Sequence, residues 1–301
     1  MNVGVVVLNY NNFDDTFDCI ESLLRVTDVS LKIYLVDNAS SDGSGQRLKN
    51  AFPNIYSIFS EINRGYGAGN NLGIEKALEE ENAYILIINN DVIVEPDFLQ
   101  PMIQILEDSD NTVGGITCKV LYMHNPTIIN AAGGRINNLI CTGESLRIGE
   151  FDDNIIETTE VDFLPGMLML IRREVFETEG LFQEHFFLYF EDLEFSRRLH
   201  KKYKLLYTSK GKVYHKCGGG IQYENYTSTY LYYYTRNRFL YYIDSNQLYK
   251  LYVTLFSFFN SIWKTYLILK EQIENRHNNV FFKKFMSLWR GFFDCLTKNP
   301  L

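Results

Sequence analysis

The sequence lacks the features of a secreted, disulfide-stabilised protein. Its five cysteines are dispersed over 301 residues, odd in number and without a C-x-x-C pair. This usage is typical of a reducing compartment rather than of a disulfide framework. The first apolar run, Val3–Leu8, is too short for a signal peptide and follows no basic segment. We therefore expect the chain to stay in the cytoplasm.

Basic residues are scarce over most of the chain. Residues 1–244 contain 21 Lys and Arg against 34 Asp and Glu, a net charge of −13. Residues 245–301 contain eight against three, a net charge of +5. An acidic body argues against nucleic acid as a partner, and a basic aromatic tail favours contact with an anionic surface.

Repeats and low-complexity linkers are absent as well, and the length suffices for one large α/β domain or two smaller ones. What is present, in residues 1–97, is an alternation of short apolar runs with segments of helical spacing. This alternation predicts a doubly wound, mostly parallel sheet flanked by helices. We expect strands at Val3–Leu8, Leu31–Val36 and Ile55–Phe59 and from Ala83 into Asn89. We expect helices at Asp14–Leu24 and Gln46–Ala51, and a third helix that the segment Asn63–Asn71 opens and that ends at about Glu81.

A polar loop rich in Asn, Asp and Gly follows each of these four strands. The loops begin at Asn9, Asp37, Asn63 and Asn89. Ligands of doubly wound sheets bind at the carboxyl ends of the strands, so we expect the four loops to form one site. The alternative is that these residues only make turns, for which Asn, Asp and Gly are favoured.

The fourth loop contains an acidic residue at the end of a strongly apolar strand. Asp91 lies between the runs AYILII and VIV. A carboxylate in this position is costly to bury unless it is paired or holds a cation. Asp91 is therefore a candidate metal ligand.

The second half of the chain is less regular. Residues 137–159 form a polar excursion, and Pro165-Gly166 interrupts the apolar run Val161–Ile171. We expect strands at Gly114–Leu121, Ile128–Ile136, Val161–Ile171, Lys204–Thr208 and Lys212–Tyr214, and helices at Arg172–Thr178 and Leu193–Lys201.

The tail has two segments with a polar stripe along an otherwise apolar helix, Leu251–Leu269 and Phe281–Phe293. Neither offers the roughly 20 apolar residues of a membrane-spanning helix, and basic amphipathic helices at the membrane interface fit the pattern better. The alternative is that both helices pack on the body or form a homodimer interface. The stripes carry Lys250, Thr254, Ser257, Ser261 and Lys264 in the first segment and Lys283, Lys284, Ser287 and Arg290 in the second.

The motifs of the chain, taken in their order, resemble those of a family-2 inverting glycosyltransferase of the GT-A fold. The resemblance is closest to the bacterial rhamnosyltransferase-like branch that builds cell-surface polysaccharide. The resemblance covers about residues 3–240. It is carried by the stretches VVVLNYNN, VDNASSDGS, NRGYGAGNNLGI, LIINNDVIVEPDFL, LPGMLMLIRREVFETEGLF, FFLYFEDLEFSRRL, VYHKCGGG and YYYTRNRFLYY.

The resemblance implies a division of the chain and a role for each loop. Residues 1–243 would form the GT-A domain, with a nucleotide-sugar half to about 115 and an acceptor half from 116. Residues 244–301 would form the tail, whose basic amphipathic pattern predicts a peripheral enzyme on the inner face of the cell membrane. The nucleotide-sugar donor would contact Asn9, Asn11, Asp37, Asn38, Asp42, Asn63, Gly65, Asn70, Asn89, Asn90 and Asp91.

The resemblance also implies the catalytic groups. Asp91 would be the metal-binding residue of the family's D-x-D motif, whose first acid is here Asn89, and His215 a second ligand. Asp192 would be the catalytic base, beside Glu191. The family usually has an Asp two residues after the acidic pair, where this chain has Glu194. On the acceptor side, the expected residues are Pro165, Gly166 and Arg236.

The chemistry supports these roles independently. A nucleoside diphosphate brings roughly two negative charges into an acidic domain, and Mn²⁺ or Mg²⁺ would neutralise them. Carboxylate and imidazole are ligands compatible with Mn²⁺ and, less decisively, with Mg²⁺. An acceptor hydroxyl needs a positioned base, worth about 10²–10⁴-fold. One base and in-line attack would invert the anomeric centre of the transferred sugar, which is rhamnose if the resemblance extends to the substrate.

Structural alternatives exist for each of these residues. A lone His at a strand end is more often a hydrogen-bonded structural residue, and Glu191-Asp192 could complement a helix N-terminus. Arg236 could lie on a solvated face instead of contacting a phosphate of a lipid-linked acceptor.

Three other functions compete with the glycosyltransferase interpretation. A nicotinamide dehydrogenase requires G-x-G-x-x-G in its first β–α turn, which this chain lacks there, and a nucleotidyltransferase requires a basic glycine loop that Asn9–Asn12 does not supply. A non-catalytic sugar-nucleotide sensor or scaffold is the remaining alternative. The presence of Asp91, Asp192 and His215 together argues against it.

Overall fold

The computed structural model describes residues 2–216, 226–274 and 281–297. They fall into two compact units. The first comprises residues 1–136, 143–184 and 191–217, and the second residues 137–142, 185–190 and 218–301. The expected division at residue 243 stays a prediction. Cys217 and the glycines of VYHKCGGG lie outside the described residues.

The first unit is built on one ten-stranded sheet. Its strands run in the order β10-β12-β6-β11-β4-β1-β2-β3, with β5 paired to β12 and β7 to β6. Strands β1–β4 are mutually parallel, whereas β11 is antiparallel to both β4 and β6. The strands are β1 (Asn2–Asn9), β2 (Ser30–Asp37), β3 (Tyr56–Phe59), β4 (Tyr84–Asn89), β5 (Val92–Val94), β6 (Val113–Tyr122), β7 (Asn125–Ala131), β10 (Thr158–Glu160), β11 (Leu168–Arg172) and β12 (Lys204–His215).

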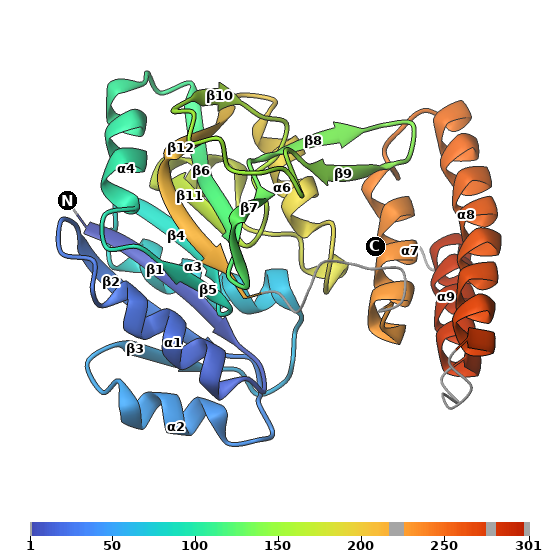
Figure 1. The fold of residues 1–301 in the computed structure, drawn as a ribbon, viewed down its shortest axis with the longest axis horizontal. Helices are drawn as coiled ribbons and strands as arrows, with labels where there is room; N and C mark the ends of the chain where they lie inside the picture. Colours follow the sequence, from blue (N-terminus) through green and yellow to red (C-terminus); the bar gives the residue numbers. More distant parts are fainter. Residues whose placement is uncertain (1, 217–225, 275–280, 298–301) are drawn as a thin grey trace. The chain divides into compact units, whose positions relative to one another are not determined.

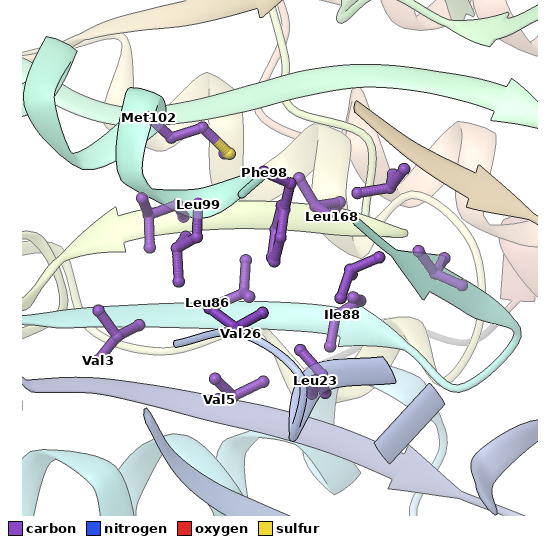
Figure 2. Packing of buried hydrophobic residues seen from close by; sticks show 14 of the residues in the cluster. Val3, Val5, Leu23, Val26, Leu86, Ile88, Phe98, Leu99, Met102 and Leu168 are labelled. Carbon is purple, nitrogen blue, oxygen red and sulfur yellow. The ribbon is translucent and has the colours of Figure 1, made fainter. Parts of the chain in front are cut away.

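Helices cover both faces of this sheet (Figure 1). One buried cluster joins the sheet to α1, α2 and α4, and part of it is drawn in Figure 2. A second cluster joins the opposite face to α3, α5 and α6. The predicted mostly parallel sheet flanked by helices is therefore confirmed. The helices are α1 (Phe13–Leu23), α2 (Ser44–Ala51), α3 (Tyr66–Glu79), α4 (Leu99–Asp108), α5 (Arg173–Glu179) and α6 (Glu191–Leu199), preceded by the 3₁₀ turn η1 (Glu184–Phe186).

Small residues let α3 lie close to β1. A Cβ atom added at Gly73 would come within 2.5 Å of Val6, and one added at Gly69 within 2.7 Å of Leu8. Because Gly69, Gly73 and Ala77 recur every four residues, they lie on one face of the helix. These glycines therefore serve helix–sheet packing.

Four predicted strands, in three stretches of the chain, differ in the structure. The run Ile128–Ile136 is split by Gly133, whose φ of +74° ends β7 before β8 (Gly134–Asn137) begins. Of Val161–Ile171, only the part after Pro165-Gly166 forms a strand, β11, because proline has no N–H to donate and interrupts the run. The two strands expected between 204 and 214 are one strand, β12, with a shift of register between Thr208 and Lys212.

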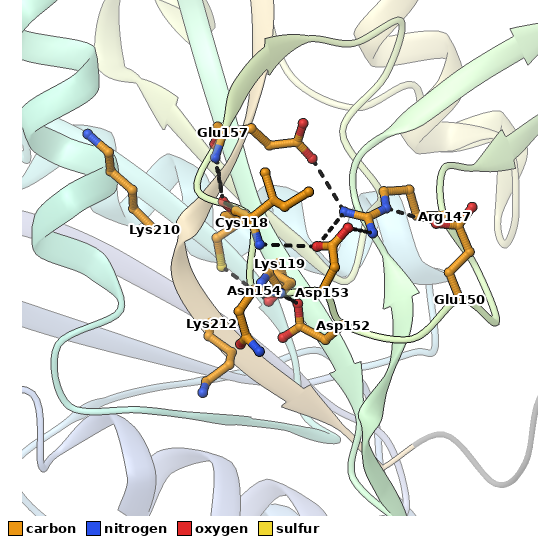
Figure 3. Close-up of polar contacts among 12 residues, drawn as sticks. Cys118, Lys119, Arg147, Glu150, Asp152, Asp153, Asn154, Glu157, Lys210 and Lys212 are labelled. Carbon is orange, nitrogen blue, oxygen red and sulfur yellow. Dashed lines mark hydrogen bonds and ion pairs between the residues drawn. The ribbon is translucent and has the colours of Figure 1, made fainter.

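One ion pair ties the polar excursion to the sheet at Asp152, and further ion pairs lie within the excursion. Lys119 Nζ and Asp152 Oδ1 lie 2.6 Å apart with little solvent exposure (Figure 3). Arg147 pairs with Glu150 and with Asp153 at 2.9 and 2.7 Å. The segment also forms β9 (Thr142–Ser145), which pairs with β8.

The described part of the second unit includes the helices α7 (Ser228–Tyr241), α8 (Gln247–Glu274) and α9 (Phe281–Thr297). Gly291 lets the backbone of α9 approach α7, since a Cβ there would lie 2.4 Å from the Tyr232 carbonyl oxygen. No helix in the described ranges combines the length and hydropathy needed to cross a membrane.

Part of the polar stripe of α8 faces into this unit. Ser257, Ser261 and Lys264 are buried, and on α9 Lys284 is buried in an ion pair with Glu271 at 2.7 Å. The apolar side of α8 is the exposed one. It presents Leu248, Leu251, Tyr252, Leu255, Phe258, Phe259, Ile262, Trp263, Tyr266 and Leu269, which we call the outward face of α8.

Lys264 lies in a cage of tyrosine rings. Its Nζ atom is 5.0–5.1 Å from the ring centroids of Tyr226, Tyr230 and Tyr234 and has no hydrogen-bond partner among the described residues. Burial, with Arg238 nearby, lowers the pKa of Lys264 from 10.5 to about 7. The rings offset part of the cost of the buried ammonium group.

We expect Lys264→Met to stabilise the protein at neutral pH. The folded-state pKa lies below the unfolded one, so between about pH 7 and 10.5 the unfolded chain binds more protons. The penalty of the lysine is therefore full below about pH 7 and fades as pH rises. Melting curves should show a gain of about 2–4 kcal/mol at pH 7 that shrinks by pH 10. A gain that does not change with pH would contradict this explanation.

Candidate functional site

The predicted strand-end loops are joined by hydrogen bonds centred on Asn9. Asn9 is fully buried, and its Nδ2 atom donates to Asp37 Oδ1 at 2.7 Å and to Ser44 Oγ at 2.9 Å. Its Oδ1 atom accepts from Thr16, whose hydroxyl in turn accepts from Asn90 at 2.8 Å. The first, second and fourth loops thus share one network.

The second and third loops are joined through Asn38. Its Nδ2 atom donates to Asn63 Oδ1 at 3.1 Å and to the Gly65 carbonyl at 3.0 Å, while its Oδ1 atom accepts the N–H of Arg64. Gly65 has a φ of +87°, which favours glycine at this position. The prediction that the loops lie together at one sheet edge therefore agrees with the geometry.

The remaining predicted donor residues differ in accessibility. Asn11 is exposed and accepts the N–H of Ser41 at 2.8 Å. Asp42 is exposed, and its hydrogen bonds with Ser44 lower its pKa. Asn70 is fully buried, donates to the Tyr66 carbonyl and has an Oδ1 atom without a partner in the described residues.

The Asp37 carboxylate has a defined orientation. Its second oxygen accepts the N–H of Ser40 at 3.1 Å. Gly45 lies directly against it, since a Cβ atom there would be 2.3 Å from Asp37 Cγ. The absence of a side chain at Gly45 is therefore what leaves room for this carboxylate.

Strand pairing brings Asp91 to His215. Asp91 lies in the turn between β4 and β5, and β5 pairs antiparallel with β12 so that Val92 is opposite His215. The backbone N–H of Lys216 donates to the Asp91 carbonyl at 2.8 Å. His215 Nε2 lies 3.1 Å from the Asp91 carboxylate, although 124 residues separate the two.

The donor set of this pair suits a divalent cation. His215 Nδ1 lies 3.0 Å from Asn130 Oδ1, an oxygen that only accepts, so Nδ1 carries a hydrogen. In the neutral ring, Nε2 then presents a lone pair to the carboxylate, an arrangement that a cation between them stabilises. The Oδ1 atom of Asn89, in the first position of the expected motif, is buried without a hydrogen-bond partner among the described residues.

Protein side chains alone do not complete such a site. In the ranges 2–216, 226–274 and 281–297, no group of three or more His, Cys, Asp and Glu side chains is arranged to hold a metal ion. A cation held by Asp91 and His215 would need further ligands from another molecule.

Asp192 is held by the turn that contains Gly166. Asp192 Oδ2 accepts the N–H of Gly166 at 3.0 Å, and Oδ1 accepts the N–H of Leu193 at 2.8 Å. The Gly166 carbonyl in turn accepts from the Tyr66 hydroxyl at 2.6 Å. Gly166, which sequence reasoning placed on the acceptor side, thus positions Asp192.

The environments of the two adjacent carboxyl groups differ. Burial, with Asp192 beside it, raises the pKa of Glu191 to about 8, and its Oε2 atom has no hydrogen-bond partner among the described residues. Burial also raises the pKa of Asp192, but the N–H groups of Gly166 and Leu193 oppose this shift because they stabilise the carboxylate. The two N–H groups thus favour the charged form of Asp192, whereas Glu191 Oε2 has no such donor among the described residues.

Arg236 and Pro165 contact backbone. Arg236 lies on α7, and its Nη2 atom donates to the carbonyls of His185 and Phe186 at 2.7 and 2.8 Å. Pro165 accepts the N–H of Leu168 and closes the turn before β11. Their acceptor-side roles stay predictions.

Sequence reasoning missed several supporting residues. Thr16 and Ser44 hold the Asn9 network, Asn130 orients His215, and Tyr66 fixes the Gly166 peptide. Only Ser44 and Tyr66 lie in the quoted motifs. Asn130 lies on β7 without a recognisable pattern.

The chain matches the family model described as glycosyl transferase family 2 over residues 4–180. A low-salt glycan biosynthesis hexosyltransferase of Haloferax volcanii is 27% identical over 208 residues, which are 67% of this chain and 62% of that protein. An N-acetylglucosaminyl-diphospho-decaprenol L-rhamnosyltransferase of Mycobacterium tuberculosis is 24% identical over 232 residues, 70% of this chain and 75% of the other. The chain thus spans less than two thirds of the length of the first relative.

The fold is also similar to that of a solved structure, GalNAc-T7 with UDP, GalNAc and Mn²⁺. The TM-score is 0.61 at 16% identity, and the match covers 100% of this chain and 58% of the other.

Proposed function

Because the chain belongs to glycosyl transferase family 2 and has its GT-A fold, we propose that it transfers a sugar from a nucleoside-diphosphate sugar to an acceptor hydroxyl, with inversion at the anomeric carbon. The observation that carries this proposal is the unequal hydrogen bonding of the adjacent carboxyl groups of Glu191 and Asp192. Two adjacent carboxyl groups with different environments favour one proton on the pair and one available base.

Asp192 is the base of the proposed reaction. Its carboxylate accepts the proton of the acceptor hydroxyl while the hydroxyl oxygen attacks the anomeric carbon and the nucleoside diphosphate leaves from the opposite side. The hydrogen bonds from Gly166 and Leu193 hold the carboxylate in one orientation. A neutral Glu191 avoids a second negative charge beside the base.

The loop network at the strand ends is the proposed donor site. Asp37, Asn38 and the loop at Asn63–Gly65 supply oriented acceptors and donors for a base and ribose. A thermal-shift panel of UDP, dTDP and GDP with Mn²⁺ would identify the nucleotide, because a ligand stabilises the folded state by RT ln(1 + [L]/Kd).

A divalent metal ion, Mn²⁺ or Mg²⁺, is proposed as cofactor. Asp91 and His215 would hold it, with the diphosphate oxygens as further ligands, and it would supply charge neutralisation of the leaving group. The support is the distance between Asp91 and His215 together with the Mn²⁺ in the GalNAc-T7 structure.

The transferred sugar is proposed to be a hexose or 6-deoxyhexose such as rhamnose, and the acceptor a glycan or lipid-linked saccharide of cell-surface polysaccharide synthesis. This agrees with the names of the two relatives, a hexosyltransferase and an L-rhamnosyltransferase that acts on a diphospho-decaprenol. The bacterial rhamnosyltransferase-like branch is the finer placement that follows.

We also propose that the protein binds peripherally to the inner face of the cell membrane, and that the outward face of α8 makes this contact. Lys264 and Lys284 are buried and cannot attract lipid, but Lys270 on α8 and Lys283 and Arg290 on α9 are exposed. Exposed aromatic and aliphatic residues, together with exposed cations on the same unit, favour the interface of an anionic bilayer. A homodimer through the same face is the other outcome of the test below.

For the base, we expect Asp192→Asn to lower kcat by at least about 10²-fold, because proton transfer to the base is lost. Binding of the nucleotide, measured by calorimetry, should stay within about twofold. Glu191→Gln is the matched control and should retain most activity, since Gln resembles the protonated acid. The assignment is wrong if Glu191→Gln is inactive and Asp192→Asn is not.

For the metal, we expect excess EDTA to abolish turnover and added Mn²⁺ to restore it. Asp91→Asn should also lose Mn²⁺ binding, followed by electron paramagnetic resonance of the free ion, because a carboxylate ligand is removed. Asp97→Asn, at an exposed carboxylate nearby in sequence, is the control. Full activity in EDTA would exclude the metal requirement.

For the membrane, we expect Phe259→Gln with Trp263→Gln to reduce co-sedimentation with vesicles that contain phosphatidylglycerol by about tenfold or more, because two exposed apolar side chains no longer insert. Ile156→Gln, an exposed apolar residue of the first unit, should change nothing. If the wild type ignores vesicles at low salt and these substitutions instead convert a dimer to a monomer, the face is a dimer interface.

A further inference from the structure

The turn that leads into α6 has an unfavourable backbone conformation. Three residues of the segment His185–Phe190 are left-handed: Phe187 (φ 62°), Tyr189 (φ 69°) and Phe190 (φ 74°). Bulky side chains rarely adopt this conformation because Cβ crowds the following carbonyl oxygen. It persists only where surrounding contacts impose it, and such contacts cluster at functional sites.

Asn237 supplies those contacts. Its Nδ2 atom lies within donating distance of three carbonyl oxygens of the turn, those of Phe186 (2.7 Å), Leu188 (2.8 Å) and Tyr189 (2.8 Å). The residue is fully buried on α7. Carbonyl groups that point inward together would repel one another, so a donor among them stabilises this arrangement.

Arg236 sets the direction of the Asn237 amide. Its Nε–H donates to Asn237 Oδ1 at 2.8 Å, which directs the NH₂ group of the amide to the turn. Its Nη2 atom also donates to the carbonyls of His185 and Phe186. Asn237 and Arg236 together clamp the turn 185–190 entirely within the second unit.

The turn is joined by a peptide bond to Glu191, and Asp192 follows. Both hydrogen bonds that orient Asp192 depend on how the backbone enters the first turn of α6. We propose, resting on the function proposed above, that Asn237 is a positioning residue for the base: its clamp on the turn 185–190 holds the backbone whose continuation carries Asp192.

The test compares the same substitution, Asn to Asp, at two positions of the second unit. Asn237→Asp keeps the size of the side chain but removes the N–H donors and turns an oxygen to the carbonyls. Asn246→Asp is the control, because Asn246 Oδ1 only accepts the N–H of Tyr249 at the start of α8, and a carboxylate accepts equally well. Turnover and affinity for the nucleoside diphosphate found by the thermal-shift panel are measured for both.

We expect Asn237→Asp to lower kcat about 10- to 100-fold, since a shift of about 1 Å at a catalytic group has that effect. Nucleotide affinity should stay within about twofold, and Asn246→Asp should change neither. If Asn237→Asp does not fold, Arg236→Lys is used, which keeps Asn237 but loses the Nε–H bond, and kcat should fall in the same way.

Two results would overturn the clamp: a folded variant with the kcat of the wild type, or equal losses of kcat and nucleotide affinity, which indicate a general structural role. The proposed base is tested separately. An inactive Asp192→Asn with a fully active Asn237→Asp rejects the clamp alone, whereas an active Asp192→Asn rejects the base and the clamp with it.

Discussion

The site depends on the parallel pairing of β1 with its two neighbours. In this register Asn9 is opposite Asp37, and Leu8 is opposite Asn89, so three strands end at one edge. Parallel strands place their carboxyl ends at the same edge of the sheet, so strand pairing alone brings the polar loops together there. The buried amide of Asn9 then joins the loops, because each of its polar atoms needs a partner away from water.

A second pairing, between β5 and β12, adds the metal-binding candidates. Asp91 and His215 belong to segments far apart in sequence, and the antiparallel ladder brings their side chains within 3.1 Å. The ladder is short, and the hydrogen bond from Lys216 to the Asp91 carbonyl extends it by one step. The relative position of Asp91 and His215 is therefore set by backbone hydrogen bonds between β5 and β12 rather than by attraction between the two side chains.

The helical second unit shows how charge and burial can conflict. Lys264 and Lys284 lie inside, where one is surrounded by tyrosine rings and the other is paired with Glu271. A soluble helix normally turns its polar stripe outward, so the reversal in α8 exposes aromatic surface that water does not favour. This reversal is the reason to expect a lipid or protein surface against α8.

Local pattern was sufficient for most elements. Strands β1–β4, helices α1–α3 and the order of the polar loops follow from apolar runs and turn residues, since short-range periodicity reports which side chains must be buried. The D-x-D-like turn at Asn89–Asp91 and the acidic pair Glu191-Asp192 could likewise be named as candidates, because each is a polar residue beside an apolar strand or helix start.

Only the tertiary structure decided which polar groups support others. The N–H of Gly166 holds Asp192, Asn130 orients His215, and Asn237 holds the turn before α6. These partners are 26 to 85 residues apart in the chain and follow no local period, so periodicity carries no information about them. The sequence also could not show which side of α8 is exposed. An amphipathic pattern states that a helix has two faces, and only the packing of its neighbours decides which one is buried.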